Sequence, residues 1–357
     1  MTLNRKIGLF YIGARGCTAS LSIFTLALLH NNLISQNKNF ITSLDEFKNR
    51  QFLTANAIEQ IGGIDFHNIP LYENIKTIAH RDNLNISILL ENKNVKQTLN
   101  KWSETFYPAI TKKNTNHTKS VDTIKKILTD FRERYKLDIV YVIYLSSAEE
   151  HSDMLEKMTL AQLRKAIKEN KRFIPVNILY AFAVLDSGLP FINFTSCQAN
   201  SIPALKELAW LKKVAHAGKD GKTGETYIKS VLASAFKMRN FPLLFWESHN
   251  LLGDNDGLTL QKRKLKYDKI LDKQLPVKML CNVKDQNVRI DFVKALGDWK
   301  TAWNLVEWEG IAGCRMSLQF IWRGHDGLLA APMLWDLVKF MHLAVENNSY
   351  GVQKQLS

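Results

Sequence analysis

The chain has 357 residues, 46% of them hydrophobic, so it can bury a full core, and its length suits two domains better than one. This composition excludes an intrinsically disordered chain. The formal net charge of +14 is compatible with a nucleic acid, an acidic membrane or an anionic small molecule as partner, and charge alone does not choose among them.

Cysteine usage and the N-terminus bear on the compartment. The four cysteines are far apart and include no Cys-x-x-Cys pair: Cys17, Cys197, Cys281 and Cys314. A disulfide framework and a thiolate zinc site are therefore not expected, and a reducing, cytoplasmic compartment fits best. Arg5 and Lys6 precede an apolar run, as in a secretory signal, but glycines interrupt that run early. No other stretch is predicted to span a bilayer, so no membrane partner is expected.

The chain opens with a pattern typical of a nucleotide-binding βαβ unit. Residues 7–12 are an apolar run of β-formers, residues 13–16 a turn, and residues 18–29 repeat apolar side chains at helical spacing. The turn supplies candidate cofactor-binding residues: Gly13, Ala14, Arg15 and Gly16. Its glycines permit close approach of a pyrophosphate to the helix N-terminus. Asp65 is a candidate for the ribose hydroxyls, at a longer spacing than usual. The alternative is that these glycines only end strands.

Further strands and helices continue this pattern. Residues 139–145 are predicted to be a buried strand that ends in Ser146 and Ser147, and residues 191–194 another strand after a helix over residues 179–185. Ligands bind at the carboxyl ends of such strands, so both serines are candidate cofactor contacts. Between these units, residues 93–126 are interpreted as an insertion: a helix carrying Trp102 and Phe106, then a mobile surface loop. The fold class is therefore α/β, with a doubly wound, Rossmann-like parallel sheet.

A composition shift at about residue 206 predicts a second, α+β domain with an open sheet. A helix is expected over residues 225–238, strands over residues 243–247 and 289–293, and glycine turns at residues 253–257 and 297–298. A helix over residues 328–344 is expected to return to the first domain. The dinucleotide-binding domain is thus predicted to span residues 1–205 and to be completed by residues 312–357, and the second domain to span residues 206–311.

Two candidate sites for an anion lie in the second domain. The loop over residues 218–224 places Asp220, Lys222 and Thr223 ahead of a helix, where backbone amides and a lysine can surround a phosphate. Lys294 stands near the turn at Gly297 and offers another cation for a phosphate. For each of these places the alternative is a solvated turn with balanced charges.

A dense basic run provides candidate catalytic lysines. Lys269 and Lys273 share one face of a predicted helix, where crowding and burial lower the pKa of a lysine far enough for proton exchange near neutral pH. The alternatives are a solvated face and a nucleic-acid patch. Since only one aromatic residue is interleaved with the basic run, no nucleic-acid partner is expected. No histidine pair has the spacing of metal ligands, so no metal is expected.

Four segments resemble inositol-3-phosphate synthase, also called myo-inositol-1-phosphate synthase, in its bacterial branch. They are GKDGKTGET from Gly218, NLLGDNDG from Asn250, LGDWKTAW from Leu296, and the stretch from Asp326 to Asp336. The resemblance extends over residues 7–352. It implies conversion of D-glucose 6-phosphate to 1D-myo-inositol 3-phosphate with NAD as a retained cofactor, through oxidation at C5, enolisation at C6, closure onto the C1 aldehyde and reduction.

The resemblance also implies residue roles. The matching motifs give as catalytic residues Lys269, Lys273, Lys300, Asp220 and Asp298. Asp256 and Asp326 match acidic positions close to the nicotinamide or substrate, and the loop with Ser196 and Ser201 is expected to help hold phosphate. Lys269 and Lys300 are expected to transfer protons at the C5 and C1 oxygens, and Lys273 to stabilise negative charge. The family further implies a homotetramer assembled through the sheet of the second domain.

The sequence also departs from the family. Its nucleotide loop lacks the Gly-Gly-Asn-Asn of many eukaryotic members, Gly327 stands where many relatives have serine, and residues 353–357 hold no obvious counterpart of a further active-site lysine. Two alternatives therefore stay open. One is a cyclase or dehydrogenase that acts on a different sugar phosphate, and the other is a catalytically silent NAD-binding homologue.

Overall fold

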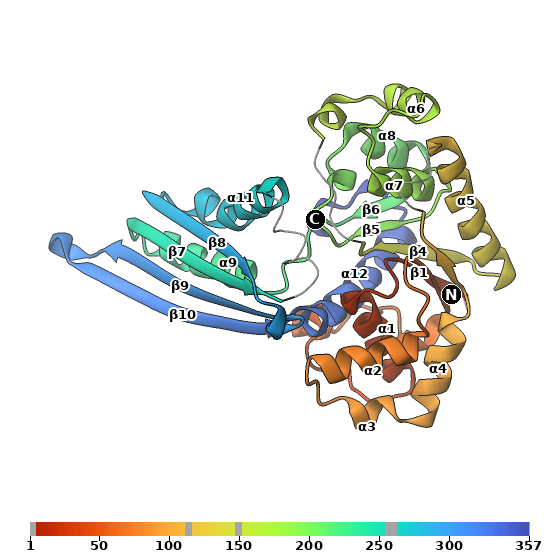
Figure 1. Ribbon diagram of the computed structural model, residues 1–357, viewed down its shortest axis with the longest axis horizontal. Coiled ribbons are helices and arrows are strands. Elements are labelled where there is room, and N and C mark those ends of the chain that lie inside the picture. Colours follow the sequence, from red (N-terminus) through yellow and green to blue (C-terminus); the bar gives the residue numbers. More distant parts are fainter. Residues whose placement is uncertain (1–4, 111–115, 147–151, 254–256, 258–262, 357) are drawn as a thin grey trace. The chain divides into compact units, whose positions relative to one another are not determined.

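A computed structural model describes residues 5–110, 116–146, 152–253, 257 and 263–356, without the side chains of residues 263–269 and 272. The chain forms two compact units (Figure 1). Unit 1 comprises residues 1–80, 84–221 and 330–357, and unit 2 comprises residues 81–83 and 222–329.

The boundaries between the units lie later in the sequence than the expected positions at 205 and 311. β6 (Ala215–Ala217) pairs with β5 (Phe191–Asn193) in the sheet of unit 1. β10 (Arg315–His325) pairs with β9 (Trp299–Glu309) in the sheet of unit 2. Because strand pairing holds β6 and β10 in these sheets, the boundaries fall after residues 221 and 329.

A seven-stranded parallel sheet forms the centre of unit 1. The remaining strands are β1 (Ile7–Ile12), β2 (Ile58–Asp65), β3 (Phe106–Pro108), β4 (Ile139–Tyr144) and β11 (Gly351–Val352). The strand order is β11-β6-β5-β4-β1-β2-β3. From β3 to β6 this is the doubly wound dinucleotide-binding order, which changes direction between β1 and β4. The predicted Rossmann-like fold is confirmed.

Helices cover both faces of this sheet (Figure 1). One layer contains α5 (His117–Arg134), α6 (Leu160–Lys168), α7 (Val176–Asp186) and α8 (Pro203–Leu211). The other contains α1 (Cys17–His30), α2 (Leu71–Arg81), α4 (Lys93–Ser103) and residues 330–346 of α12 (Asp326–Glu346), with the short α3 (Ser87–Leu90) beside α4. All six residues of β1 are buried between the layers, which is why the strand has no polar face.

The segment over residues 93–126 differs from the expected helix and loop. α4 ends at Ser103 with Trp102 buried, while Phe106 begins the edge strand β3, which pairs with β2. The surface-loop interpretation is wrong from residue 117 onward, where α5 begins. The polar composition of this segment concealed the helix, because lysines and threonines surround its apolar stripe. The stripe has helical spacing and consists of Val121, Ile124, Leu128 and Phe131.

α12 is long and apolar enough to cross a membrane by length and composition, although no stretch was expected to qualify. Within unit 1 its apolar side chains belong to the core: Ala330, Leu334, Trp335, Val338, Met341 and Ala344. Two charged residues of the helix are buried as well. Lys339 Nζ donates to Thr42 Oγ1 at 2.7 Å, and Thr42 Oγ1 donates to Asp336 Oδ1 at 2.6 Å. Burial in the core accounts for the apolar composition of the helix.

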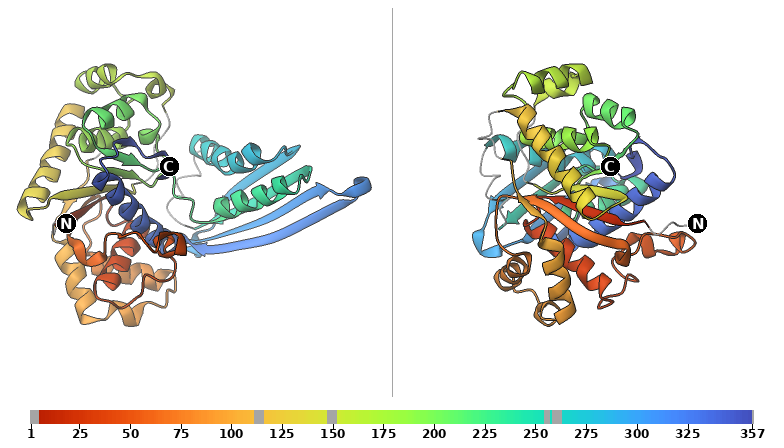
Figure 2. Two further views of the ribbon diagram at one scale, coloured as in Figure 1. Left: turned by 180° about the vertical axis from the view of Figure 1, so that it is seen from behind. Right: turned by 90° about the vertical axis from the view of Figure 1, so that its right-hand side faces the viewer.

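Unit 2 is a mixed four-stranded sheet in the order β10-β9-β7-β8. β7 (Leu243–Leu252) runs parallel to β8 (Asp285–Phe292) and antiparallel to β9. α9 (Glu225–Met238) and α11 (Arg263–Leu280) lie on one face of the sheet (Figures 1 and 2). The second α+β domain with an open sheet is confirmed. Parts of β7 and β8 were predicted, whereas β9 and β10 were not, because polar residues occupy both faces of these strands.

Candidate active site

The predicted nucleotide loop follows β1 at the carboxyl edge of the parallel sheet. Gly13 has a φ of +88°, and a Cβ atom there would lie 2.9 Å from the backbone nitrogen of Ser146, so the loop requires glycine at this position. The close approach joins the ends of β1 and β4, where the strand order changes direction. In doubly wound sheets this is where nucleotides bind.

Asp65 is the last residue of β2 and lies beside this loop. Its Oδ2 accepts the backbone N–H of Arg15 at 2.7 Å, and its Oδ1 accepts that of His67 at 2.9 Å. Each carboxylate oxygen keeps a lone pair for a further donor, such as a ribose hydroxyl. Asp65 thus fixes the loop, and it occupies the end of the second strand, as the acidic residue of a dinucleotide site does. The unusual sequence distance results from residues 31–57, which lie between α1 and β2.

Other predicted contacts follow the ends of neighbouring strands in unit 1. Ser146 lies two residues after the end of β4, and Ser196 and Asp220 lie three residues after the ends of β5 and β6. The backbone N–H of Asp220 donates to the carbonyl of Thr195 at 2.8 Å, which joins the two later loops. Because the carboxyl ends of parallel strands lie at the same edge of a sheet, these three residues follow strands that end at one edge. This edge has the elements that a dinucleotide needs.

A second site is a pocket in unit 2. Its empty volume is about 310 Å³ when the open mouth is included. Its lining gathers lysines, carboxylates and an amide from both helices and sheet: Gly224, Glu225, Asn250, Leu252, Lys273, Lys300, Thr301, Ala302, Trp322, Gly324, Asp326 and Leu329. The described part of α11 therefore contributes one predicted catalytic lysine to this pocket, and β9 contributes another.

Lys273 belongs to a closed ring of hydrogen bonds in this pocket. Its Nζ donates to Glu225 Oε2 at 3.1 Å and to Asn250 Oδ1 at 2.8 Å. Asn250 Nδ2 donates to Ser248 Oγ at 3.0 Å, and Ser248 Oγ donates to Glu225 Oε1 at 2.8 Å. Burial by itself raises the pKa of Glu225, but the ammonium groups of Lys273 and Lys229 more than offset it and leave that pKa at about 2. Glu225 is therefore a carboxylate at any physiological pH.

Lys300 forms the second lysine–carboxylate pair of the pocket. Its Nζ donates to Asp326 Oδ2 at 2.6 Å, and Thr223 Oγ1 donates to Asp326 Oδ1. Lys300 is the second residue of β9 and pairs in register with Gly324, the last but one residue of β10, which lies two residues before Asp326. The antiparallel pairing of two strand ends thus brings a lysine and a carboxylate together that are 26 residues apart.

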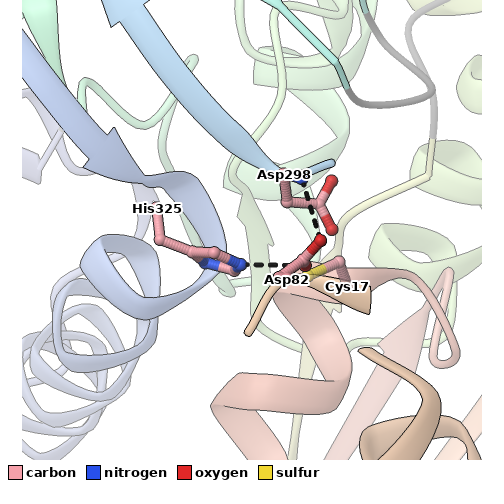
Figure 3. Close-up of side chains that lie close together, drawn as sticks. All are labelled: Cys17, Asp82, Asp298 and His325. Carbon is pink, nitrogen blue, oxygen red and sulfur yellow. Dashed lines mark hydrogen bonds and ion pairs between the residues drawn. The ribbon is translucent and has the colours of Figure 1, made fainter. Parts of the chain in front are cut away.

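The buried residues Asp82, Asp298 and His325 form a group, called the tie below, that supports the ends of these two strands (Figure 3). His325 Nε2 lies 3.0 Å from Asp82 Oδ2, and its Nδ1 accepts the backbone N–H of Leu328, so the ring hydrogen is on Nε2 and is donated to Asp82. Asp82 Oδ1 accepts the backbone N–H of Asp298 at 3.3 Å. Arg81 forms ion pairs with both carboxylates. This tie holds the chain on either side of Lys300.

The turn at Gly297 depends on that tie. Gly297 has a φ of +57°, and a Cβ atom there would lie 2.1 Å from Asp82 Oδ1. The ligand atoms of Asp82, Asp298 and His325 lie within 4.8 Å of one another, a size that can hold a metal ion. Each of these side chains is already engaged in the ion pairs and hydrogen bonds described, so the group acts as a structural tie around the turn.

Comparison with known proteins identifies the family. Residues 59–355 match the family described as myo-inositol-1-phosphate synthase, an NAD-binding family. The chain belongs to this family. NAD is accordingly its cofactor, and the loop at Gly13, the end of β2 and the strand order of unit 1 fit that group.

Named relatives agree with this membership. The chain is 30% identical over 268 residues to inositol-3-phosphate synthase 1 of Bacteroides thetaiotaomicron, covering 72% of this chain and 62% of that protein. It is 29% identical over 236 residues to inositol-3-phosphate synthase 1 of Oryza sativa subsp. japonica, covering 63% of this chain and 46% of that protein. The matched part thus spans less than two thirds of the length of these relatives.

Solved structures share the fold. An inositol-3-phosphate synthase from Caenorhabditis elegans matches with a TM-score of 0.78 and 20% identity, covering 96% of this chain and 75% of that chain. A myo-inositol-1-phosphate synthase-related protein from Thermotoga maritima matches with a TM-score of 0.74 and 19% identity, covering 97% of this chain and 89% of that chain. Both similarities concern the architecture.

Within this family member, the pocket gathers only some of the predicted residues. Lys273, Lys300 and Asp326 line it, and Thr223 bonds to Asp326. Asp298 is buried in the tie, outside the lining. Lys222 and Lys294 are exposed and do not line the pocket, and Ser201 is exposed in unit 1. Ser147, Asp256 and the side chain of Lys269 lie outside the described residues.

Sequence reasoning missed Glu225, Asn250 and Lys229 as site residues. A signal was present for two of them. Glu225 and Lys229 are four residues apart, in line with the apolar core residues Ala233 and Phe236. Burying charged side chains on the core face of an amphipathic helix costs free energy unless each meets an opposite charge. Two such residues on that face therefore indicate a polar site beneath the helix.

Proposed function

We propose that this chain catalyses the NAD-dependent conversion of D-glucose 6-phosphate to 1D-myo-inositol 3-phosphate. Family membership supports the reaction, and the observation that carries it for this chain is the pocket in which Lys273 and Lys300 each meet a carboxylate. An enolisation and an aldol closure both develop negative charge on oxygen, which preorganised ammonium groups stabilise. The glycine loop after β1 and the strand order of unit 1 support the second requirement, a site for NAD.

The chain's own residues divide this work. Bound NAD supplies a hydride acceptor for the alcohol and returns the hydride at the end. Lys300, hydrogen-bonded to Asp326, is proposed to exchange the proton at a sugar oxygen, together with Lys269. Lys273, held by Glu225 and Asn250, is proposed to stabilise the developing oxyanion. Thr223 and the first turn of α9 at Gly224 are proposed to bind phosphate oxygens, since helix N-termini attract anions.

Other predicted residues keep their proposed roles. The NAD contacts are proposed to come from the loop at Gly13 and from the ends of β2 and β4, with Asp256 and Asp326 nearer the reacting carbon. Phosphate contacts are proposed for Ser196, Ser201, Lys222 and Lys294, and catalytic support for Asp220 and Asp298. These assignments follow the resemblance of motifs.

The decisive experiment is inositol phosphate formation from glucose 6-phosphate with NAD. The unmodified chain is compared with Lys300→Ala, Lys269→Ala and the control Lys237→Met, which removes an exposed lysine from α9. We expect product with the unmodified chain and the control, and a loss of at least about a hundredfold in turnover in the two alanine variants, as for removal of one stabilising donor.

Two other outcomes separate the alternatives. Turnover of a different hexose phosphate, with none of glucose 6-phosphate, would assign the pocket to another sugar-phosphate cyclase or dehydrogenase. NAD binding without turnover of any hexose phosphate would identify a silent homologue. Either result would overturn the proposed reaction.

We also propose that the chain forms a homotetramer through the sheet of unit 2. α9 and α11 cover one face, while the other face exposes Trp303 and Ile321, by 36% and 70%, among charged side chains. A large exposed apolar group on a sheet face is stabilised by contact with a second copy. Sedimentation at micromolar concentration is expected to show a tetramer, and Ile321→Glu to dissociate it; a monomer in the unmodified chain would contradict this assembly.

A cytoplasmic location is proposed as well. The four cysteines are far apart in the sequence and include no Cys-x-x-Cys pair, which suits a reducing compartment. Cell fractionation of the tagged protein is expected to place it in the cytoplasmic fraction, and recovery in a membrane or secreted fraction would contradict the assignment.

A further inference from the structure

Lys229 is a lysine of unit 2 that the reaction does not use directly. Its side chain is 0% exposed, and its Nζ lies 2.8 Å from Glu225 Oε1. The same ammonium group lies 6.0 Å from the centre of the Trp246 ring. Lys229 does not line the pocket, whereas Glu225 does. The lysine therefore stands behind the carboxylate, on the core side of the pocket wall.

Glu225 thus stands between two ammonium groups. Lys229 approaches one carboxylate oxygen at 2.8 Å and Lys273 the other at 3.1 Å. Both contacts are ion pairs, and Lys273 also donates a hydrogen bond. Since Coulomb interactions add, the positive potential of Lys229 at Lys273 offsets part of the negative potential of Glu225. Two lysines and one glutamate leave the cluster with one positive charge in excess.

The excess charge can act only at the open end of the cluster. Lys229 is closed off by α9 and β7, but the Lys273 side chain is 12% exposed and lines the pocket. We propose that Lys229 is a positioning residue that, by sharing the Glu225 carboxylate, leaves Lys273 with an unneutralised positive charge for an anionic oxygen of the ligand. This inference deepens the proposed function and rests on it for the identity of that ligand.

The surrounding charges support this arrangement. Burial lowers the pKa of Lys229, and Glu225 acts in the opposite direction. Around Lys273, α9 contributes Glu225 and Lys229, β9 contributes Lys300, and α12 contributes Asp326 to the same pocket. β7 contributes the neutral Asn250 and Ser248, with Glu247 acting on Lys229 from the same strand. Lys300 and Asp326 balance each other, so Lys273 is the pocket cation whose charge depends on Lys229.

The arrangement predicts opposite effects from two substitutions. Lys229→Met removes a repelling charge and leaves Glu225 to neutralise Lys273, so Lys273 becomes less reactive towards acylation and its anion binding weakens. Glu225→Gln removes the attracting charge, so Lys273 becomes more reactive. In the variant that combines both substitutions the cluster again carries one positive charge, and no ion is left buried without a counter-charge.

The test measures the charge of Lys273 without using turnover. Acetylation of Lys273 by acetic anhydride is followed against pH by peptide mass spectrometry, and binding of inorganic phosphate is followed by ³¹P NMR. The variants are Lys229→Met, Glu225→Gln, the double variant, and the control Lys237→Met on the exposed side of α9. We expect the acetylation midpoint to rise in Lys229→Met, fall in Glu225→Gln and lie between them in the double variant.

Phosphate binding provides the second readout. We expect Lys229→Met to weaken it about tenfold, the scale of one charge acting across a partly solvated site, and the double variant to restore it to within about threefold. An unchanged midpoint in Lys229→Met, or a double variant as weak as Lys229→Met, would overturn the charge sharing, and so would absence of phosphate binding by the unmodified chain. If these effects appear but no inositol phosphate forms, the reaction assignment fails and the role of Lys229 stands.

Discussion

The two lysine–carboxylate pairs of the pocket differ in what lies behind the carboxylate. Glu225 and Lys273 have side chains that are 3% and 12% exposed, and a second ammonium group backs the glutamate. Lys300 and Asp326 are 24% and 29% exposed, with a threonine hydroxyl on the aspartate. The shielded pair is held in one geometry by its hydrogen-bond ring, whereas the solvated pair is open to water. One pocket thus contains one shielded and one solvent-accessible lysine–carboxylate pair.

The largest expected contrast between the pairs is in stability. Glu225→Ala leaves Lys229 buried without a counter-charge, so we expect a loss of about 3–5 kcal/mol in the free energy of unfolding. Asp326→Ala removes a partly exposed pair and is expected to cost about 1 kcal/mol or less. Urea denaturation of both variants measures the difference. Equal losses in the two variants would show that burial does not distinguish the pairs.

The second largest expected effect is the loss at acid pH of the stability that the shielded pair contributes. The pKa of Glu225 is about 2 in the folded chain against an ordinary value of 4.5, so its contribution to stability is complete above pH 4.5 and is lost as the pH falls towards 2. A shift of this size corresponds to about 3 kcal/mol. Urea unfolding at pH 5, 4 and 3 is expected to show a shallower pH dependence in Glu225→Gln than in the unmodified chain. Glu309→Gln, at an exposed strand end, is the control and should leave the slope unchanged.

A third expected effect concerns the tie behind the solvated pair. Asp82→Asn keeps the side-chain volume but removes the negative charge that Arg81 and His325 contact. In the unmodified chain these two partners hold the pKa of Asp82 below its usual range. We expect a loss of about 1–2 kcal/mol in the free energy of unfolding, as for a weakened buried hydrogen-bond group. Hydrogen exchange should accelerate at the amides of Asp298 and Asp326. Unchanged exchange at both amides would contradict the role of the tie.

Much of unit 1 could be predicted because its signals are local. The apolar run of β1, the glycine turn and the helical spacing of α1 lie within 30 residues, and each follows from backbone preferences alone. α5 was missed because its apolar stripe is spread among lysines, and the edge strand β3 because it has only three residues and pairs with a distant segment. Edge strands depend on their partner for stability, which a local pattern does not reveal.

The candidate site was predicted only where a residue type implied its chemistry. Lys273, Lys300 and Asp326 were assigned from motifs that resemble the family, and the structure gathers them in one pocket. Glu225 and Lys229 were overlooked because each reads as an ordinary surface charge of a helix until the packing of α9 on β7 and α11 is known. Their burial, and not their identity, makes them part of the site.

The sequence by itself determined the α/β class and the family, and it predicted the glycine loop after the first strand, because these depend on residue type and local order. Tertiary structure decided which carboxylate each lysine meets, which lysine is closed off from solvent, and how the turn before β9 is held by Asp82. Such pairings join segments up to 216 residues apart. Their free energy depends on distance and on exclusion of water, and both are set only when helices and strands pack.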